Sequence, residues 1–240
     1  MSRQINVRVR SVVVKERLKY LPIIASDKLL GDHKVRNNRI ADKGVVVLIS
    51  NEKDASIRDV CDMVKDYIIN KKTSLPPAVV ISAGNRDISR KGFVMNHPVS
   101  LGKEGEVITS MIDYTMGKLV DLEEFIISKG GILMVAPAIP RPADQCFENC
   151  IGIPQWMQKF YSEAHQKLNA KIKTMNEDNG LQTPPIDTYM EKSKAPAQRS
   201  THQKKIYKTY YHSDLIYPLQ SKQLKMITTL ERAIKGVARN

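Results

Sequence analysis

Cysteine is scarce in this sequence and long apolar segments are absent, and each absence argues against a class of protein. Three cysteines among 240 residues are few and odd in number, which disfavours a disulfide-stapled secreted domain. Cys146 and Cys150 form a CxxxC pair, but no second pair completes a zinc site. We therefore expect reduced structural thiols and no bound metal. No apolar run approaches the length of a membrane span, so no membrane-spanning helix is expected.

The beginning of the chain also lacks the uninterrupted apolar stretch of a signal peptide, because basic residues from Arg8 to Arg17 break it up. A transit peptide is the alternative interpretation, since the segment is rich in arginine and its first acidic residue is Glu16. We expect residues 1–19 to form a basic N-terminal arm on a cytoplasmic or nuclear protein.

Acidic residues are too few to balance the basic ones. The chain has 38 Lys and Arg against 25 Asp and Glu, a formal net charge of +13. Solubility requires a smaller net charge from a domain of this size. The excess favours a polyanionic partner, and nucleic acid before an anionic membrane surface. A generally basic proteome is the alternative explanation.

Short apolar runs alternate with longer segments of helical periodicity. This alternation predicts a three-layer α/β/α fold with a parallel sheet of about five strands, in one domain over residues 20–240. A helix is expected to start near Asp54 or Ser56, with Cys61 and Val64 on its apolar face. The clearest strands are expected at 20–26, 45–50, 78–83 and 132–136, and the further helices at 105–129, 154–175 and 221–237.

Four loops at strand or helix ends carry short sequence blocks. The first strand ends Ala-Ser-Asp-Lys-Leu-Leu-Gly over 25–31, and the third is followed by Gly-Asn-Arg-Asp-Ile over 84–88. Residues 136–142 are proline-rich, and Asp-Leu-Ile-Tyr-Pro over 214–218 precedes the closing helix. In order and placement these blocks resemble those of the SGNH, or GDSL-type, hydrolases over nearly the whole chain. The resemblance implies a flavodoxin-like SGNH hydrolase fold.

The catalytic positions of that family are occupied by other residues here. Asp27 stands where the nucleophilic serine is expected, Arg86 replaces an asparagine and Tyr217 replaces the histidine base, while Asp214 matches. Asp27 has no hydroxyl, and a tyrosine with a pKa of about 10 is a poor base at neutral pH. We therefore expect an inactive hydrolase-like protein without a cofactor. It is similar in this to esterase-like domains of retroelement proteins and to the hydrolase-like RNA-binding domain of the germ-plasm protein Oskar.

A one-residue shift offers a different set, because Ser26 precedes Asp27, Asn85 precedes Arg86 and His212 lies two residues before Asp214. Ser26 would then be the nucleophile, Asn85 an oxyanion donor and His212 the base of an active esterase or acetyl-hydrolase. Against this alternative, a one-residue shift at a strand end turns the side chain to the opposite face of the sheet. A third hypothesis is a viral or retroelement-derived module for protein interaction and assembly.

The leading hypothesis is a protein that binds RNA or single-stranded DNA through basic loops. A basic insertion at about 190–212 combines cations with tyrosines, as single-stranded nucleic acid requires for charge neutralisation and base stacking. Lys28 and Arg86 are expected at the mouth of the former active site. The full predicted binding set is Lys28, Lys34, Arg36, Arg39, Arg86, Lys192, Lys194, Arg199, Lys204, Lys205, Lys208, Tyr207 and Tyr210.

Overall fold

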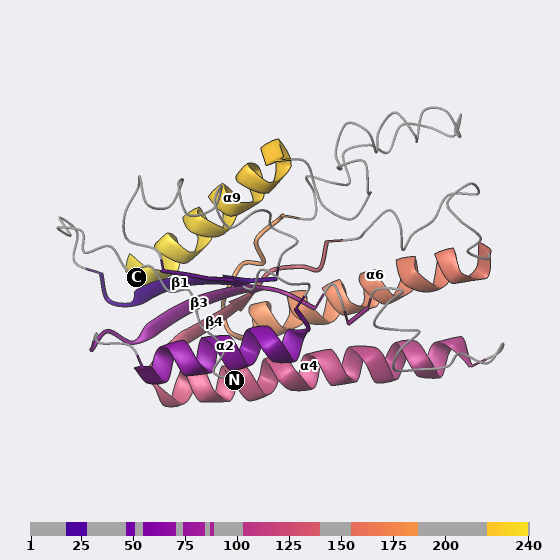
Figure 1. Ribbon diagram of the computed structural model, residues 1–240, viewed down its shortest axis with the longest axis horizontal. Coiled ribbons are helices and arrows are strands. Elements are labelled where there is room, and N and C mark those ends of the chain that lie inside the picture. The colour runs from indigo at the N-terminus through magenta and orange to yellow at the C-terminus, as the bar shows by residue number, and fades with distance from the viewer. Residues whose placement is uncertain are drawn as a thin grey trace, which may run out of the picture.

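A parallel sheet lies between two layers of helices in the part of the chain that the computed structural model describes (Figure 1). That part comprises residues 18–27, 47–50, 55–70, 74–84, 87–88, 103–139, 155–186 and 220–239. Its elements are β1 (Leu21–Ser26), β2 (Val47–Ser50), α2 (Ile57–Asn70), β3 (Pro77–Ser82), α4 (Glu104–Ser128), β4 (Ile132–Val135), α6 (Gln155–Asp178) and α9 (Gln220–Arg239).

The four described strands follow the order β2-β1-β3-β4, and every neighbouring pair is parallel. Parallel pairing requires each strand to be buried on both faces, which explains why the strands are short and almost entirely apolar. All six residues of β3 are buried. The three-layer parallel architecture predicted from the sequence is confirmed. About five strands were predicted, and the described residues contain four of them.

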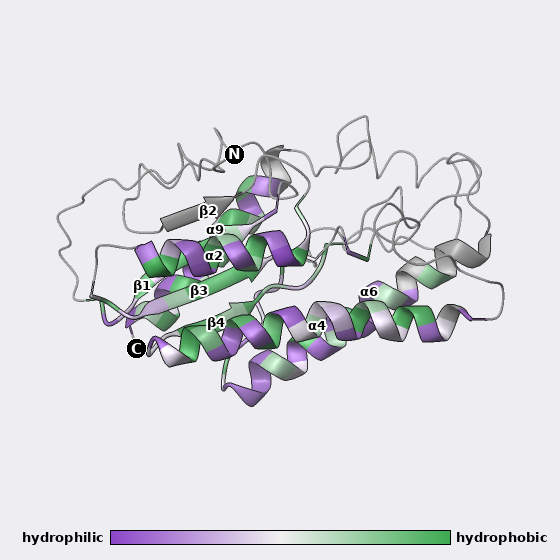
Figure 2. Cartoon of the chain, turned by 60° about the horizontal axis from the view of Figure 1, so that its bottom comes forward, coloured by the Kyte–Doolittle hydropathy of each residue, from purple (hydrophilic) through white to green (hydrophobic). Residues whose placement is uncertain are grey.

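The two faces of the sheet bury separate apolar clusters. Ile23 and Ala25 of β1 belong to the cluster under α2, α4 and α6, whereas Ile24 belongs to the cluster under α9. Figure 1 shows α9 on one side of the sheet, with α2 and α4 on the other. Figure 2 shows purple and green residues alternating along α2 and α4, as expected of helices with one face on a core and one in water.

The helices begin and end close to the expected residues. The apolar face predicted for α2 is confirmed, since Ile57, Val60, Cys61, Val64 and Ile68 are all buried. The strands β1 and β3 begin one residue away from the expected positions, at Leu21 and Pro77. Helix α6 continues three residues past the expected end, to Asp178. None of the described helices is long and apolar enough to cross a membrane.

Helices α4 and α6 are longer than the sheet. Figure 1 shows both helices running past the carboxyl ends of the strands, with α4 starting far beyond them. Ile108 and Met111 of α4 and Phe160 and Ala164 of α6 are buried in one cluster. This packing holds together the ends of α4 and α6 that extend past the strands. The two helices therefore border one side of the carboxyl edge of the sheet.

Candidate functional site

The carboxyl edge of the sheet is the candidate site, because open parallel sheets bind ligands where their strands end. Three serines are aligned at this edge. Ser26 at the end of β1 pairs in register with Ser50 of β2 on one side and with Ser82 of β3 on the other. Three neighbouring strands are therefore apolar along their length and finish with a serine at the same edge of the sheet.

Ser26 and Asp27, the two residues proposed for the nucleophile position, are both fully buried. The backbone N–H of Asp27 donates to the carbonyl of Ser82 at 3.3 Å, so the ladder continues one residue beyond β1. Since side chains alternate along a strand, Ser26 faces the α9 layer together with Ile24, and Asp27 faces the opposite layer. The two candidates therefore lie on opposite faces of the sheet.

Ser82 adds a buried hydroxyl that the sequence analysis did not single out. Its side chain is 1% exposed, and its Oγ has no hydrogen-bond partner among the described residues. Ser82 is directly in register with Ser26, so both side chains face the α9 layer. A buried hydroxyl without a hydrogen-bond partner lowers the stability of the fold. The only sequence signal for Ser82 was the presence of polar residues at the ends of the apolar strands.

The turn after β3 begins at Gly84, whose φ of +94° lies in the region that favours glycine. The Gly84 carbonyl accepts hydrogen bonds from the N–H groups of Asp87 at 3.1 Å and Ile88 at 3.3 Å. A Cβ at Gly84 would also lie 3.4 Å from the Thr115 side chain of α4. The Gly-x-x-Asp block of the sequence is therefore a tight turn that aims Asp87 back at the scaffold.

Asp87 and Ser56 satisfy the first N–H groups of α2. Asp87 Oδ2 accepts a 2.7 Å hydrogen bond from the N–H of Ile57. Ser56 Oγ accepts from the N–H of Asp59 at 3.2 Å, and Asp59 Oδ2 accepts from the N–H of Ser56 at 3.1 Å, which is a capping box. A helix N-terminus that could attract an external anion already has the carboxylate of Asp87 beside it.

Two asparagines of α6 bind the backbone of β4 and of the loop that follows it. Asn176 accepts from the N–H of Val135 at 2.9 Å and donates to its carbonyl at 2.7 Å. Asn169 makes the same pair of bonds with Ala138, at 2.8 and 3.1 Å. The two amides lie seven residues apart on one face of the helix and take the place of a neighbouring strand. The start of the loop at 136–142 is thereby fixed beside the carboxyl edge.

Cys61 is part of the wall of a surface cavity of about 390 Å³ between α2 and α4. Burial raises the pKa of its thiol from 9.0 to about 12, so the thiol stays protonated and unreactive at neutral pH. Burial also raises the pKa of Tyr67. This cavity combines Arg58, Lys65 and Lys118 with two carboxylates, and its thiol is not an activated nucleophile.

Most of the residues predicted for the site lie outside the described residues. Of the hydrolase-like set, the structure places Ser26 and Asp27, while Asn85, Arg86, His212, Asp214 and Tyr217 are outside the description. The whole predicted nucleic-acid set is also outside it. Among the described residues, no group of three or more His, Cys, Asp or Glu side chains is arranged to hold a metal ion.

The charge of the protein is unevenly divided. The described residues contain fifteen Lys and Arg and fifteen Asp and Glu, so their formal net charge is zero. The entire excess of +13 belongs to the remaining residues, which have 23 basic and 10 acidic side chains. Segment 28–46, which follows β1, and segment 187–219, which precedes α9, each carry a net charge of +3.

Solved structures with a similar arrangement include a lipase, a member of a lipolytic family and a phospholipase. A GDSL-like lipase from Bacteroides thetaiotaomicron superimposes with a TM-score of 0.58 and 14% identity, over 91% of this chain and 89% of that chain. A member of the lipolytic G-D-S-L family from Veillonella parvula gives 0.58 at 9% identity, over 89% and 97% of the two chains. Phospholipase A1 from Streptomyces albidoflavus gives 0.52 at 13% identity, over 88% and 98%.

No protein-family model matches the sequence, and no curated protein matches it either. The likeness is therefore one of structure. It extends over nearly the full length of both partners in each comparison. At such low identity it establishes the architecture and leaves the chemistry to be argued from this chain's own residues. The chain has the fold of the SGNH, or GDSL-type, hydrolases.

Proposed function

We propose that this protein binds RNA or single-stranded DNA on an SGNH hydrolase scaffold that no longer carries out serine ester hydrolysis. The charge of the sequence carries the proposal: 38 Lys and Arg stand against 25 Asp and Glu, and segments 28–46 and 187–219 each carry a net charge of +3. Solubility requires a smaller net charge from a domain of this size. Cations gathered in particular segments match a polyanion.

The positions of these segments in the chain support binding at the carboxyl edge. Segments 28–46 and 187–219 adjoin β1 and α9 and contain the predicted lysines and tyrosines. Lysine and arginine would neutralise phosphates and release counterions. Tyr207 and Tyr210 would supply planar surfaces for unpaired bases, which stack on aromatic rings without regard to sequence. Binding of this kind is strong at low salt and weakly selective for sequence.

The residues at the end of β1 support the loss of hydrolase chemistry. A serine hydrolase needs a hydroxyl that an ester carbonyl can approach, beside a base. Asp27 has no hydroxyl, and Ser26 and Asp27 are both 0% exposed. Neither side chain is exposed to solvent, where a substrate would have to reach it.

The test compares two triple charge reversals in binding to a labelled single-stranded RNA. Lys204→Glu, Lys205→Glu and Lys208→Glu change the predicted basic insertion. Lys167→Glu, Lys171→Glu and Lys173→Glu make the same change of charge on α6, where all three lysines are exposed. We expect the first variant to bind at least tenfold more weakly at about 0.1 M salt, and the second to stay close to the wild type. Equal affinity of the first variant and the wild type would refute a role for the insertion.

An active esterase is the second candidate, favoured by the lipases and the phospholipase among the similar structures. In that case Ser26 is the nucleophile, with Asn85 and His212 as its partners. The protein would then turn over a short-chain aryl ester, and Ser26→Ala would abolish the turnover. We expect no turnover above the rate of a denatured sample, because the Ser26 side chain is buried.

A further inference from the structure

The helices on the two faces of the sheet carry opposite charge. Helices α2, α4 and α6, which cover one face, together have twelve acidic and seven basic residues, whereas α9 has five basic residues and one acidic residue. These helices cover opposite faces (Figure 1). The charge of the described helices is therefore unevenly placed. It is net positive on α9 and net negative on the helices that cover the other face of the sheet.

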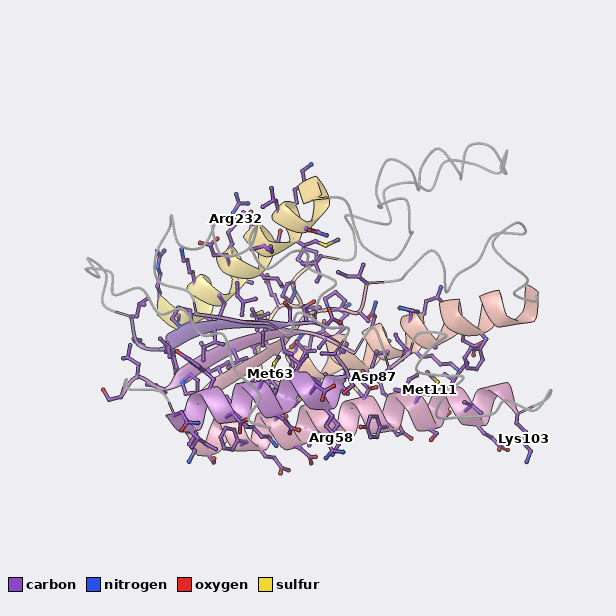
Figure 3. The ribbon with its side chains drawn as sticks, viewed as in Figure 1. Arg58, Met63, Asp87, Lys103, Met111 and Arg232 are labelled. Atoms are coloured by element: carbon purple, nitrogen blue, oxygen red, sulfur yellow. The ribbon has the colours of Figure 1, made fainter. Side chains whose placement is uncertain are left out.

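The cations of α9 are arranged in a row. Lys225, Arg232 and Arg239 are all exposed, and each lies seven residues from the next. Seven residues make nearly two turns, so the three side chains share one side of the helix, about 10 Å apart along its axis. Figure 3 shows Arg232 on the side of α9 that faces away from the sheet.

The acidic residue of α9 does not offset this row at the surface. Glu231 is 4% exposed, and its Oε1 lies 2.7 Å from Nζ of Lys235. The negative charge is thus held below the surface and neutralised by a fourth cation of the same helix. Lys225, Arg232 and Arg239, which we call the α9 basic row, remain at the surface.

We propose that the α9 basic row binds the sugar-phosphate backbone of the nucleic acid, as a rigid contact surface in addition to the basic segments. This inference rests on the proposed function, because it takes the polyanion to be nucleic acid. Cations at fixed positions on a helix lose little conformational freedom on binding, so they set where the strand runs. Base stacking would be left to the tyrosines of the insertion.

An anionic membrane fits the same row less well. Helices that lie on membranes insert large apolar side chains beside their cations. Met226, Ile227, Leu230 and Ile234 of α9 are instead buried against the sheet. The exposed large apolar side chains among the described residues are Ile69, Tyr114, Val120 and Ile127, all on α2 and α4. A helix that offers charge without an apolar surface is suited to phosphates in water.

Two double charge reversals test the row, with fluorescence anisotropy of a labelled single-stranded RNA in the full chain. One variant carries Lys225→Glu and Arg232→Glu. The matched control carries Arg58→Glu and Lys103→Glu, two exposed cations of the α2 and α4 layer (Figure 3). We expect the α9 variant to bind at least tenfold more weakly at about 0.1 M salt, with a salt slope shallower by about 1.4, because two phosphate contacts are lost. The control should bind within about twofold of the wild type.

Each other outcome has a definite meaning. If the wild type binds and the α9 variant equals it, the row is refuted while the proposed function stands. If both variants weaken binding equally, the effect is one of net charge and the row is again refuted. If the α9 variant loses affinity for phosphatidylserine vesicles but not for RNA, the row serves a membrane. A wild type that fails to bind RNA at about 50 mM salt refutes the proposed function and the row together.

Discussion

The carboxylate of Asp87 accepts a hydrogen bond of 2.7 Å from the backbone N–H of Ile57, thirty residues earlier in the chain. This contact joins the turn after β3 to the first turn of α2. Both segments border the carboxyl edge of the sheet. The Gly-x-x-Asp block that resembles a hydrolase motif therefore has a structural role in this chain, whatever ligand the edge binds.

Replacing Asp87 should destabilise the fold by loss of this cap. Asp87→Ala leaves the N–H of Ile57 without its acceptor, and we expect the free energy of unfolding to fall by about 1–2 kcal/mol. Asp87→Asn keeps an oxygen in place and should cost less. Urea unfolding followed by circular dichroism measures both. Asp66→Ala, on the exposed side of α2, is the control, and a similar loss there would contradict the assignment.

The two α6 asparagines should differ in their contribution to stability. Asn176→Ala removes both partners of the buried Val135 backbone, and we expect a loss of about 3 kcal/mol. Asn169→Ala should cost about 1–2 kcal/mol, because its contacts with Ala138 are only partly buried. Asn70→Ala, at the exposed end of α2, should stay within about 0.5 kcal/mol of the wild type. Equal effects of all three substitutions in urea unfolding would refute this role.

Gly131 has no room for a side chain. A Cβ there would overlap the carbonyl oxygen of Pro77 and crowd the side chain of Ile126. We expect Gly131→Ala to lower the free energy of unfolding by about 2–3 kcal/mol, since backbone atoms would have to move. Gly117→Ala on α4 meets open space and should raise stability by about 0.5–1 kcal/mol. Thermal unfolding of both variants, with opposite signs expected, is the measurement.

The buried thiol of Cys61 should make stability fall at high pH. Its pKa is raised from 9.0 to about 12 in the fold, so above pH 9 the unfolded chain loses this proton first. The folded state then holds more protons, and stability decreases by up to about 1.4 kcal/mol per pH unit as pH rises between the two values. Below pH 9 the thiol is protonated in both the folded and the unfolded state, so it does not make the free energy of unfolding depend on pH.

The contribution of Cys61 is isolated by comparing the wild type with Cys61→Ala, because other groups also titrate at high pH. Urea unfolding at several pH values should show a difference between the two proteins that is constant below about pH 9 and changes above it. A difference that stays constant throughout would show that the Cys61 thiol titrates normally in the fold.

The architecture was predictable because its signals are local. Runs such as Pro77–Ser82 are short and apolar on both faces, as a buried parallel strand requires, and α2 shows helical spacing from Ile57 to Ile68. The first and last residues of the helices were harder to predict, because hydrogen bonds from capping side chains determine where a helix begins and ends. The capping box of Ser56 and Asp59 starts α2 at Ile57, one residue after the later of the two expected starts.

The contacts of the site were not predictable to the same degree, because they join distant segments. Nothing near Asp87 in the sequence indicates that Ile57 is its partner. Asn169 and Asn176 resemble ordinary surface residues of a polar helix, and only the path of β4 beside α6 shows their role. The α9 basic row was also missed, because a helix with scattered cations becomes a charged face only when its packing is known.

The most direct test of the account is the salt dependence of wild-type binding to a labelled single-stranded RNA. The protein should first be treated with nuclease and purified, so that no bound nucleic acid remains. We expect tight binding at about 50 mM salt and a logarithmic slope of about −4 or steeper up to about 200 mM, as for six or more phosphate contacts. Absence of binding at the lower salt concentration, or an affinity that salt leaves unchanged, would contradict the central claim that the excess charge serves to bind nucleic acid.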